Sequence, residues 1–367
     1  MSSSSLFRVA VLSVPKHEYV VNGVAAHPRF QIVVVADDAD QPDWVHERNE
    51  GTARKYGVPY VRDVAKALRD FNVQVACISS QAERHCDLAV RAANAGLHVV
   101  QDKPMSTKVS ECDRVVEAVA RANVKFLLWN RNGLPALVHA RETLDQGAIG
   151  LPLAVHVDFY FAKDAGVPKG SRKPGDPPVN WLQHQIAAHA DGSDGGVGKE
   201  PMGELKIEGI YPLAYLRALT GAEVRRVFAR TTAHFHQLNV DNDVEDLATV
   251  TMEMDHGLVG TLCIGRIGRA SHPDAGEIKI HVLGSEGAMA ISEARPEVAV
   301  HHRGQAPKAM RRRRIAGEND WILMDSFARA IDTDGETMLD ARAGRAICAT
   351  VAAAIESGRT GKPVEVR

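Results

Sequence analysis

The stretch QIVVVAD at Gln31–Asp37 is a continuous β-branched run that ends in a carboxylate. A strand that is apolar along its whole length is typical of a parallel sheet with helices on both faces. Similar short apolar runs recur through the first 128 residues, and helix-like stretches separate them. Right-handed crossovers between such strands predict a doubly wound, Rossmann-like sheet. The expected strands are Phe7–Val14, Gln31–Asp37, Val73–Ser79, Leu97–Gln101 and Lys125–Trp129.

The pattern changes after residue 150, where apolar and polar residues alternate along runs joined by short turns, as in TVTMEM at Thr249–Met254. This alternation indicates antiparallel strands with one exposed face. A helix is expected at Met202–Leu219, and two more near the end of the chain. We therefore expect an α/β protein with a Rossmann domain at residues 6–129. A second α/β domain, with an open, mostly antiparallel sheet, is expected at residues 130–367.

Composition excludes several classes of protein. The chain has 44 basic and 46 acidic residues, for a formal net charge of −2, without the basic excess of a nucleic-acid binder. Its apolar runs are shorter than the ~20 residues that a membrane helix needs, and the first residues lack the pattern of a signal peptide. The five cysteines form no CxxC pair. We predict a cytoplasmic protein with free thiols and neither a nucleic-acid nor a membrane partner.

The first βα turn is unusual because it contains no glycine, where a dinucleotide-binding turn normally has three. It is LSVPKHEY at Leu12–Tyr19. One interpretation is that Ser13, Lys16 and the following helix N-terminus hold the phosphates. The alternative is that nothing binds at this turn.

Asp37 and Asp38 follow the second strand, about twenty residues beyond the first turn. A carboxylate at this point accepts hydrogen bonds from both hydroxyls of the adenosine ribose and repels a 2′-phosphate. The pair therefore favours NAD over NADP as the cofactor. The alternative is an Asp-Asp pair that merely begins a turn.

The most specific motif is AGLHVVQDKPMS at Ala95–Ser106, which ends a strand in Asp102, Lys103 and Pro104. Open α/β sheets bind ligands at this edge. The motif resembles the "AGKHVxxEKPxA" strand of the Gfo/Idh/MocA family of NAD(P)-dependent dehydrogenases. The family's "TPNxxH" turn appears altered at Ser80–His85, and its "GxxxDxGxHxxDxxRxLTG" helix is similar to Gly203–Gly221.

This resemblance covers essentially the whole chain and implies a Rossmann domain followed by an α/β domain whose exposed sheet face forms a homo-oligomer. It implies that Lys103 assists hydride transfer and that Asp102 orients it. Tyr211 occupies the place of the usual catalytic histidine, whereas Ile207 replaces an aspartate. By the same resemblance, further residues lie beside the cofactor: Ser79, Ser80, His85 and Arg131.

Polar side chains recur on one face of the helix expected at Met202–Leu219. Glu204, Glu208, Tyr211 and Tyr215 are spaced four, three and four residues apart, which places them in one stripe. Two carboxylates and a phenol together form a plausible acid/base group, with Glu208 assisting Tyr211. The alternative is a solvated edge of the helix.

Further substrate-binding candidates rest on position alone: Trp129, Asn130, Tyr160, Lys163, Trp181 and His189, together with Glu204. Three cations in the long loop at Asp164–Lys199 favour an anionic substrate group, with a solvated basic loop as the alternative. His184 and His189 lack helical metal-ligand spacing, so no metal is predicted.

Three functions are compatible with these features. The leading hypothesis is an NAD-dependent oxidoreductase that acts on a secondary alcohol of a sugar, polyol or cyclic carbohydrate derivative. A rival is a redox-neutral glycoside-cleaving enzyme that oxidises, eliminates and reduces again, without net NADH. A third is a regulator that binds a dinucleotide without chemistry.

Overall fold

The computed structural model describes residues 6–15, 17–161, 202–235, 237–266, 278–292, 297–302, 308–311 and 316–367. The chain divides into two compact units. The first comprises Met1–Gly133 with Ala316–Cys348, and the second Leu134–Ile315 with Ala349–Arg367. Residues 316–348 thus belong to the first unit. The domain boundary expected from the sequence, between residues 129 and 130, would instead place them in the second.

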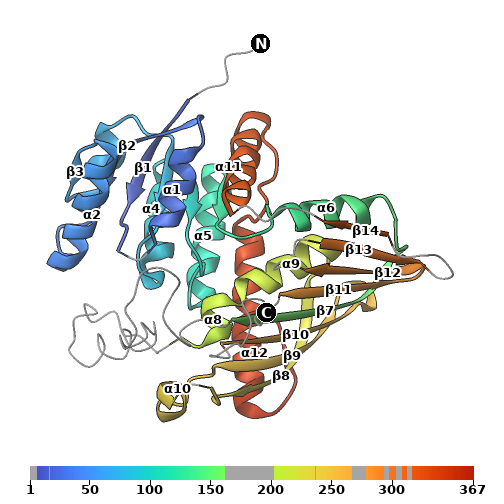
Figure 1. Ribbon diagram of the computed structural model, residues 1–367. Coiled ribbons are helices and arrows are strands. Elements are labelled where there is room, and N and C mark those ends of the chain that lie inside the picture. The colour runs from blue at the N-terminus through green and yellow to red at the C-terminus, as the bar shows by residue number, and fades with distance from the viewer. Residues whose placement is uncertain are drawn as a thin grey trace, which may run out of the picture. The chain divides into compact units, whose positions relative to one another are not determined.

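The first unit is built on a six-stranded sheet whose neighbouring strands are all parallel (Figure 1). The strand order, β3-β2-β1-β4-β5-β6, is that of a doubly wound Rossmann sheet. The Rossmann prediction is therefore confirmed. The strands are β1 Phe7–Leu12, β2 Phe30–Ala36, β3 Tyr60–Val61, β4 Val75–Ile78, β5 His98–Gln101 and β6 Phe126–Leu128.

Helices separate these strands, and two more helices come from the end of the chain. The helices are α1 Glu18–Ala26, α2 Asp43–Tyr56, α3 Val64–Asp70, the short η1 Ala82–Arg84, α4 His85–Asn94, α5 Val109–Ala122, α11 Ala316–Thr333 and α12 Ala341–Thr360, of which residues 341–348 belong to the first unit. Phe30 of β2 stacks on Phe327 of α11, with ring centroids 6.1 Å apart. Both rings are buried in one core cluster with Val20 and Val24 of α1. The late helix α11 thus completes the core of the first unit.

The second unit contains a nine-stranded sheet of order β14-β13-β12-β11-β7-β10-β9-β8-β15. Its strand pairs are antiparallel except β7 with β10, which is parallel. The mostly antiparallel sheet was expected and is confirmed. The strands are β7 Pro152–Phe161, β8 Val224–Thr232, β9 Leu247–Met254, β10 Val259–Arg266, β11 Lys279–Gly284, β12 Gly287–Ser292, β13 Glu297–His302, β14 Lys308–Arg311 and β15 Val364–Glu365.

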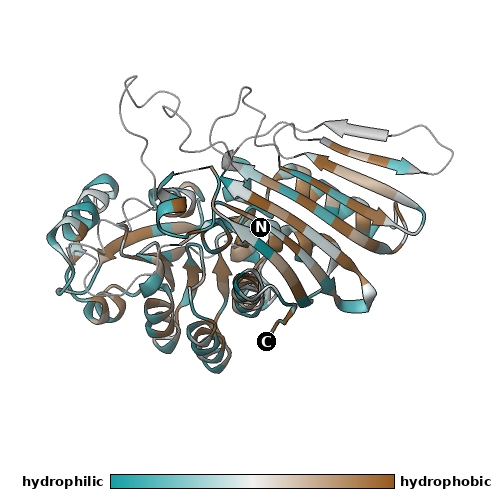
Figure 2. Cartoon of the chain, turned by 90° about the horizontal axis from the view of Figure 1, so that it is seen from below, coloured by the Kyte–Doolittle hydropathy of each residue, from teal (hydrophilic) through white to brown (hydrophobic). Residues whose placement is uncertain are grey.

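One face of this sheet is buried and the other is exposed. Burial alternates residue by residue along β9, as the sequence pattern predicts. Figure 2 shows hydrophilic and hydrophobic residues mixed along the strands of the sheet. The other elements of the unit are α6 Pro135–Asp145, α8 Glu204–Glu208, α9 Ile210–Thr220, α10 Gln237–Asp241 and the short η2 Asp255–Gly257.

The single helix expected at Met202–Leu219 is in fact two helices, α8 and α9, which meet at Gly209. Pro212 lies in the first turn of α9, where its missing N–H costs no helical hydrogen bond. Proline in the interior of one continuous helix would leave a carbonyl of the preceding turn without its donor. Pro212 therefore accounts for the break. It was not predicted because the polar residues of this region, Glu204 to Tyr215, keep their helical spacing across it.

Within the part of the chain that the structure describes, no helix is both long and apolar enough to cross a membrane. The same residues contain no group of three or more potential metal-binding side chains. His189 lies outside the described residues.

Candidate functional site

The first βα turn lies at the carboxyl edge of the Rossmann sheet, directly after β1. Ser13 has a φ of +64° and donates its backbone N–H to Ala36 at 3.0 Å. This left-handed conformation is the one that glycine adopts without strain, and it costs other residues roughly 1 kcal/mol or more. The Ser13 hydroxyl is buried and has no hydrogen-bond partner among the described residues. Lys16, the other phosphate-binding candidate, lies outside the described residues.

Protein groups hold the remainder of this turn. The Val14 N–H donates to Asn49 Oδ1 at 2.7 Å, and the Ser79 hydroxyl donates to the carbonyl of His17 at 2.6 Å. Helix α1 begins after His17 without a side-chain cap. An uncapped helix N-terminus supplies N–H donors for an anion. The turn thus keeps one element of a phosphate-binding site, although it lacks the glycines.

Asp102 lies at this edge, directly after β5, and its side chain is fully buried. Oδ2 lies 2.6 Å from His17 Nδ1, and Oδ1 accepts hydrogen bonds from Tyr19 Oη at 2.9 Å and the Lys103 N–H at 2.8 Å. Burial acts to raise the pKa of Asp102. The hydrogen bond from His17 and the nearby positive charges outweigh burial and lower the pKa to about 2. Asp102 is therefore ionised at neutral pH.

Lys103 follows Asp102 and is buried, and the peptide bond to Pro104 is cis. His85 lies nearby with both ring nitrogens against carbonyl oxygens, Nδ1 at 2.7 Å from Pro104 and Nε2 at 3.0 Å from Ser80. The Ser80 hydroxyl donates to the carbonyl of Gln81. His85 thus joins the turn after β4 to the turn that carries Lys103. Its geometry is that of a positioning residue, since it is fully buried.

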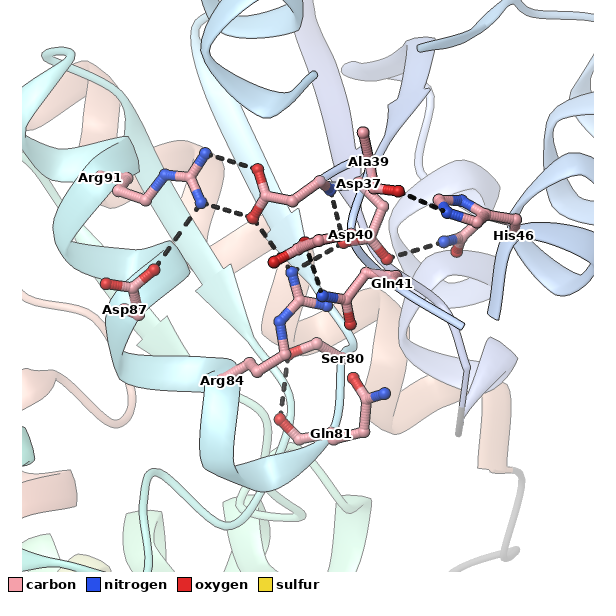
Figure 3. Close-up of polar contacts among 12 residues, drawn as sticks. Asp37, Ala39, Asp40, Gln41, His46, Ser80, Gln81, Arg84, Asp87 and Arg91 are labelled. Carbon is pink, nitrogen blue, oxygen red and sulfur yellow. Dashed lines mark hydrogen bonds and ion pairs between the residues drawn. The ribbon is translucent and has the colours of Figure 1, made fainter. Parts of the chain in front are cut away.

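Asp37 and Asp38, after β2, accept hydrogen bonds from two arginines, Arg84 and Arg91. Figure 3 shows these arginines together with Asp37. Asp37 is buried and accepts hydrogen bonds from Arg84 Nη2 and Asn49 Nδ2, both at 2.8 Å. Asp38 accepts two from Arg91, at 2.7 and 2.8 Å, and lies 3.2 Å from Arg84 Nη2. The hydrogen bonds from Arg91 are the main cause of a lowered pKa at Asp38. Both carboxylates were predicted from the sequence, whereas none of these partners was.

The residues after β6 mostly stabilise the fold. Trp129 is buried, and its ring lies so close to Gly23 of α1 that a Cβ at Gly23 would be 2.5 Å from it. The Asn130 side chain donates to the Leu128 carbonyl at 2.7 Å and accepts from the Asn132 N–H at 2.8 Å. The Asn130 side-chain amide thus forms hydrogen bonds within its own turn. Arg131 is half-buried, and its positive charge acts on Asp320.

In the second unit, Glu204 and Glu208 of α8 face one cation, Arg266, at the end of β10. Arg266 Nε is 2.5 Å from Glu204 Oε1, and Nη2 is 3.8 Å from Glu208 Oε1. All three side chains are buried. This burial excludes the solvated helix edge that sequence analysis left open. Arg266 was missed because it ends a strand far from the helix in the sequence.

Tyr211 and Tyr215 of α9 are buried against Phe159 of β7, with ring centroids 6.1 Å from it in each case. Tyr160, the next residue of β7, points to the opposite face of the sheet. There its hydroxyl lies 3.5 Å from Asp158 Oδ1. The structure therefore does not bring Tyr160 together with Tyr211. Lys163 and Trp181 lie outside the described residues.

A Rossmann sheet with an ionised aspartate and a buried lysine at its carboxyl edge defines a class, the dinucleotide-binding oxidoreductases. The family model for an oxidoreductase family with an NAD-binding Rossmann fold matches residues 16–129. The model for the C-terminal alpha/beta domain of the same family matches residues 197–366. The chain belongs to this family, Gfo/Idh/MocA, as the resemblance of its motifs predicted.

Named relatives include dehydrogenases of cyclic polyols. The chain is 26% identical over 299 residues to a scyllo-inositol 2-dehydrogenase (NAD(+)) of Bacillus subtilis, which covers 78% of this chain and 74% of that protein. Among solved structures, an oxidoreductase from Agrobacterium radiobacter in complex with NAD+, L-tartaric acid and magnesium has a TM-score of 0.80 at 16% identity, covering 99% of both chains. Levoglucosan dehydrogenase in complex with NADH has a TM-score of 0.79 at 20% identity, covering 99% of this chain and 100% of its own. These likenesses in structure confirm the fold.

Proposed function

We propose that this protein transfers hydride reversibly between NAD and a secondary alcohol of a sugar, polyol or cyclic carbohydrate derivative. One observation carries the proposal: a buried lysine, Lys103, at the carboxyl end of β5 beside the ionised Asp102. A relative that oxidises an inositol and a structural neighbour that oxidises levoglucosan support the substrate class.

The residues present fit a bound NAD at the carboxyl edge of the first unit's sheet. Asp37 would accept hydrogen bonds from the adenosine ribose, and the uncapped start of α1 would hold the pyrophosphate. When bound, NAD supplies the hydride acceptor for the carbon that carries the hydroxyl. The fully buried Asp102 carboxylate accepts a hydrogen bond from the Lys103 backbone N–H and so holds the backbone at Lys103 in place.

The residues of this chain then manage the proton. We propose that Lys103 relays the proton of the substrate hydroxyl as the C–H bond breaks, and that the negative charge of Asp102 stabilises positive charge on Lys103. Tyr211, with Glu208 assisting it, is a second proposed acid/base group for this proton transfer. The Arg266 guanidinium holds Glu208 in place and compensates part of the charge of the two carboxylates of α8.

The first experiment measures NADH formation with a panel of inositols, sugars and sugar acids. We expect at least one substrate to yield NADH stoichiometrically. Lys103→Met should lower kcat by roughly 100-fold or more, with the Kd for NAD+ within about threefold of wild type. Tyr211→Phe should lower kcat by about 10–100-fold. Lys66→Met, at an exposed site on α3, is the matched control and should leave kcat unchanged.

The outcomes separate the competing functions. Cleavage of a glycoside with NAD present but no net NADH would replace this proposal by the redox-neutral cycle. NAD+ binding without turnover of any substrate would favour the sensing regulator. A Lys103→Met variant as active as wild type would remove the lysine from the mechanism.

A further inference from the structure

Three of the five cysteines gather in the first unit, against the turn that follows β5. The thiol of Cys86, in α4, donates a hydrogen bond to the Met105 carbonyl at 3.4 Å. The thiol of Cys348, in α12, donates to the Ser106 carbonyl at 3.4 Å. The Cys112 thiol, in α5, forms hydrogen bonds with both of these thiols. We refer to the three cysteines as the thiol cluster.

An ion pair between α5 and α12 lies directly beside two of these thiols. Arg345 of α12 pairs with Asp113 of α5, with Nε 2.8 Å from Oδ1. The carboxylate belongs to the residue after Cys112, and the guanidinium lies about one helical turn before Cys348. The ion pair thus holds the two helices together where the thiols of Cys112 and Cys348 meet. Thiols already in contact can form a disulfide without a large movement of the backbone.

The two thiols differ in exposure and in acidity. Cys348 is partly exposed, whereas Cys112 is buried. The hydrogen bond from Cys112 and the positive charge of Arg345 lower the pKa of Cys348, although burial acts against them. Hydrogen bonds to Cys348 and Cys86, together with burial, raise the pKa of Cys112. Because a peroxide reacts with the thiolate form of cysteine, Cys348 is the thiol of this pair that reacts first.

We propose that Cys348 and Cys112 form a redox switch, in which a disulfide between them removes a hydrogen bond from the turn that carries Lys103. The oxidant is hydrogen peroxide or an organic peroxide. In the first step, the Cys348 sulfur attacks the peroxide, the O–O bond breaks, and the sulfur becomes a sulfenic acid while the peroxide is reduced to water or an alcohol. In the second step, the Cys112 sulfur attacks the Cys348 sulfur. The S–S bond forms, the S–O bond breaks, and water leaves with the Cys112 proton.

The disulfide changes the hydrogen bonding of the turn that follows β5. The Cys348 thiol donates to the Ser106 carbonyl, and a disulfide sulfur has no proton to donate. The Met105 carbonyl keeps another donor, Gln101 Nε2 at 2.9 Å. Ser106 lies three residues after Lys103, so oxidation should hold the backbone around Lys103 less firmly. The expected effect on turnover rests on the proposed function, whereas the disulfide itself does not.

The test treats the reduced full chain with a small molar excess of hydrogen peroxide, blocks the remaining thiols with iodoacetamide, and maps disulfides by mass spectrometry without reduction. We expect a peptide pair that joins Cys112 to Cys348, and dithiothreitol should reverse it. Cys348→Ser should abolish this disulfide, and Cys112→Ala should leave Cys348 as a sulfenic acid that dimedone labels. Cys263→Ser is the matched control and should leave the disulfide unchanged, since Cys263 is also partly exposed but lies on β10.

Hydrogen–deuterium exchange of wild type measures the effect on the turn and needs no variant. In the oxidised protein, the peptide that contains residues 102–108 should exchange about tenfold faster or more than in the reduced protein. Dithiothreitol should restore slow exchange. With a substrate that yields NADH, oxidation should lower kcat of wild type by about tenfold or more, and kcat of Cys348→Ser should resist the same treatment.

The outcomes that contradict the switch differ from those that contradict the proposed function. Sulfinic acid at Cys348 without a disulfide would overturn the inference, as would a disulfide that joins Cys112 to Cys86 instead. Unchanged exchange at residues 102–108 in the disulfide-bonded protein would also overturn it. All three results would leave the proposed function intact. If no substrate yields NADH, the proposed function fails, and the disulfide map and the exchange rates still decide the inference.

Discussion

Asp102 is the residue at which burial and charge compete most directly. Its pKa is lowered from 3.8 to about 2 in the folded protein, because hydrogen bonding and positive charge outweigh desolvation. A carboxylate with a lowered folded-state pKa stabilises the fold at pH above its unfolded value. The contribution, roughly 2 kcal/mol at neutral pH, is lost as the pH falls from 3.8 through 2.

We therefore expect the free energy of unfolding to decrease less steeply with acid in Asp102→Asn than in wild type. Urea unfolding at about pH 5, 4 and 3 measures the two slopes. Asp113→Asn, a half-exposed carboxylate paired with Arg345, is the control and should keep most of the wild-type slope. Equal slopes for Asp102→Asn and wild type would show that folding does not lower the pKa of Asp102.

Among single residues, the polar side chains that follow the strands could be predicted from the sequence, but the side chains that bond to them could not. Asp37, Asp102 and Lys103 each follow an apolar run, so their place at the sheet edge could be inferred from spacing alone. The partners come from elsewhere: Arg84 lies 47 residues from Asp37, and His17 lies 85 residues from Asp102. A single sequence gives positions along the chain but not which distant side chain meets which carboxylate.

At the scale of elements, helix α1 shows why its glycine is needed. A Cβ at Gly23 would lie 2.5 Å from the Trp129 ring and 3.2 Å from Cβ of Asp320, so α1 could not pack as closely. Gly51, in the interior of α2, has nothing nearer to its Cβ position than an Arg54 side-chain nitrogen at 4.0 Å. Glycine in a helix interior otherwise costs roughly 0.5–1 kcal/mol relative to alanine.

The two glycines should therefore respond oppositely to alanine. Gly23→Ala should destabilise the protein by about 1–3 kcal/mol through overpacking against Trp129. Gly51→Ala should stabilise it by roughly 0.5–1 kcal/mol. Denaturant unfolding monitored by tryptophan fluorescence measures both changes. If Gly23→Ala were as favourable as Gly51→Ala, α1 would not be closely packed on Trp129.

The elements themselves could be predicted where the apolar pattern was long. Strands β1, β2 and β4 lie within their expected ranges or differ at the ends by one residue. The two-residue strand β3 is too short to leave a pattern, and α6 was missed although Pro135 stands at its first turn. The break between α8 and α9 was missed because the polar stripe continues across Gly209.

At the scale of the whole molecule, the return of the chain at residues 316–348 to the first unit could not be inferred from sequence order. The apolar face of α11 is compatible with packing on either unit. Only the structure shows Leu323, Met324 and Phe327 buried with Phe30 and the α1 valines. The dinucleotide-binding unit is therefore discontinuous, and its core depends on residues encoded after the second unit.

Substitution of Phe327, which is fully buried, tests whether α11 belongs to the core of the first unit. Phe327→Ala removes the ring that stacks on Phe30 and should cost about 3–5 kcal/mol. Because the lost contacts belong to the first unit, hydrogen–deuterium exchange should accelerate in the peptides of β1 and β2, and strands β8 to β10 should keep their wild-type protection. Arg329→Ala, at an exposed site on the same helix, should change neither. Faster exchange confined to α11 would contradict a shared core, and faster exchange in β8 to β10 alone would assign the helix to the second unit.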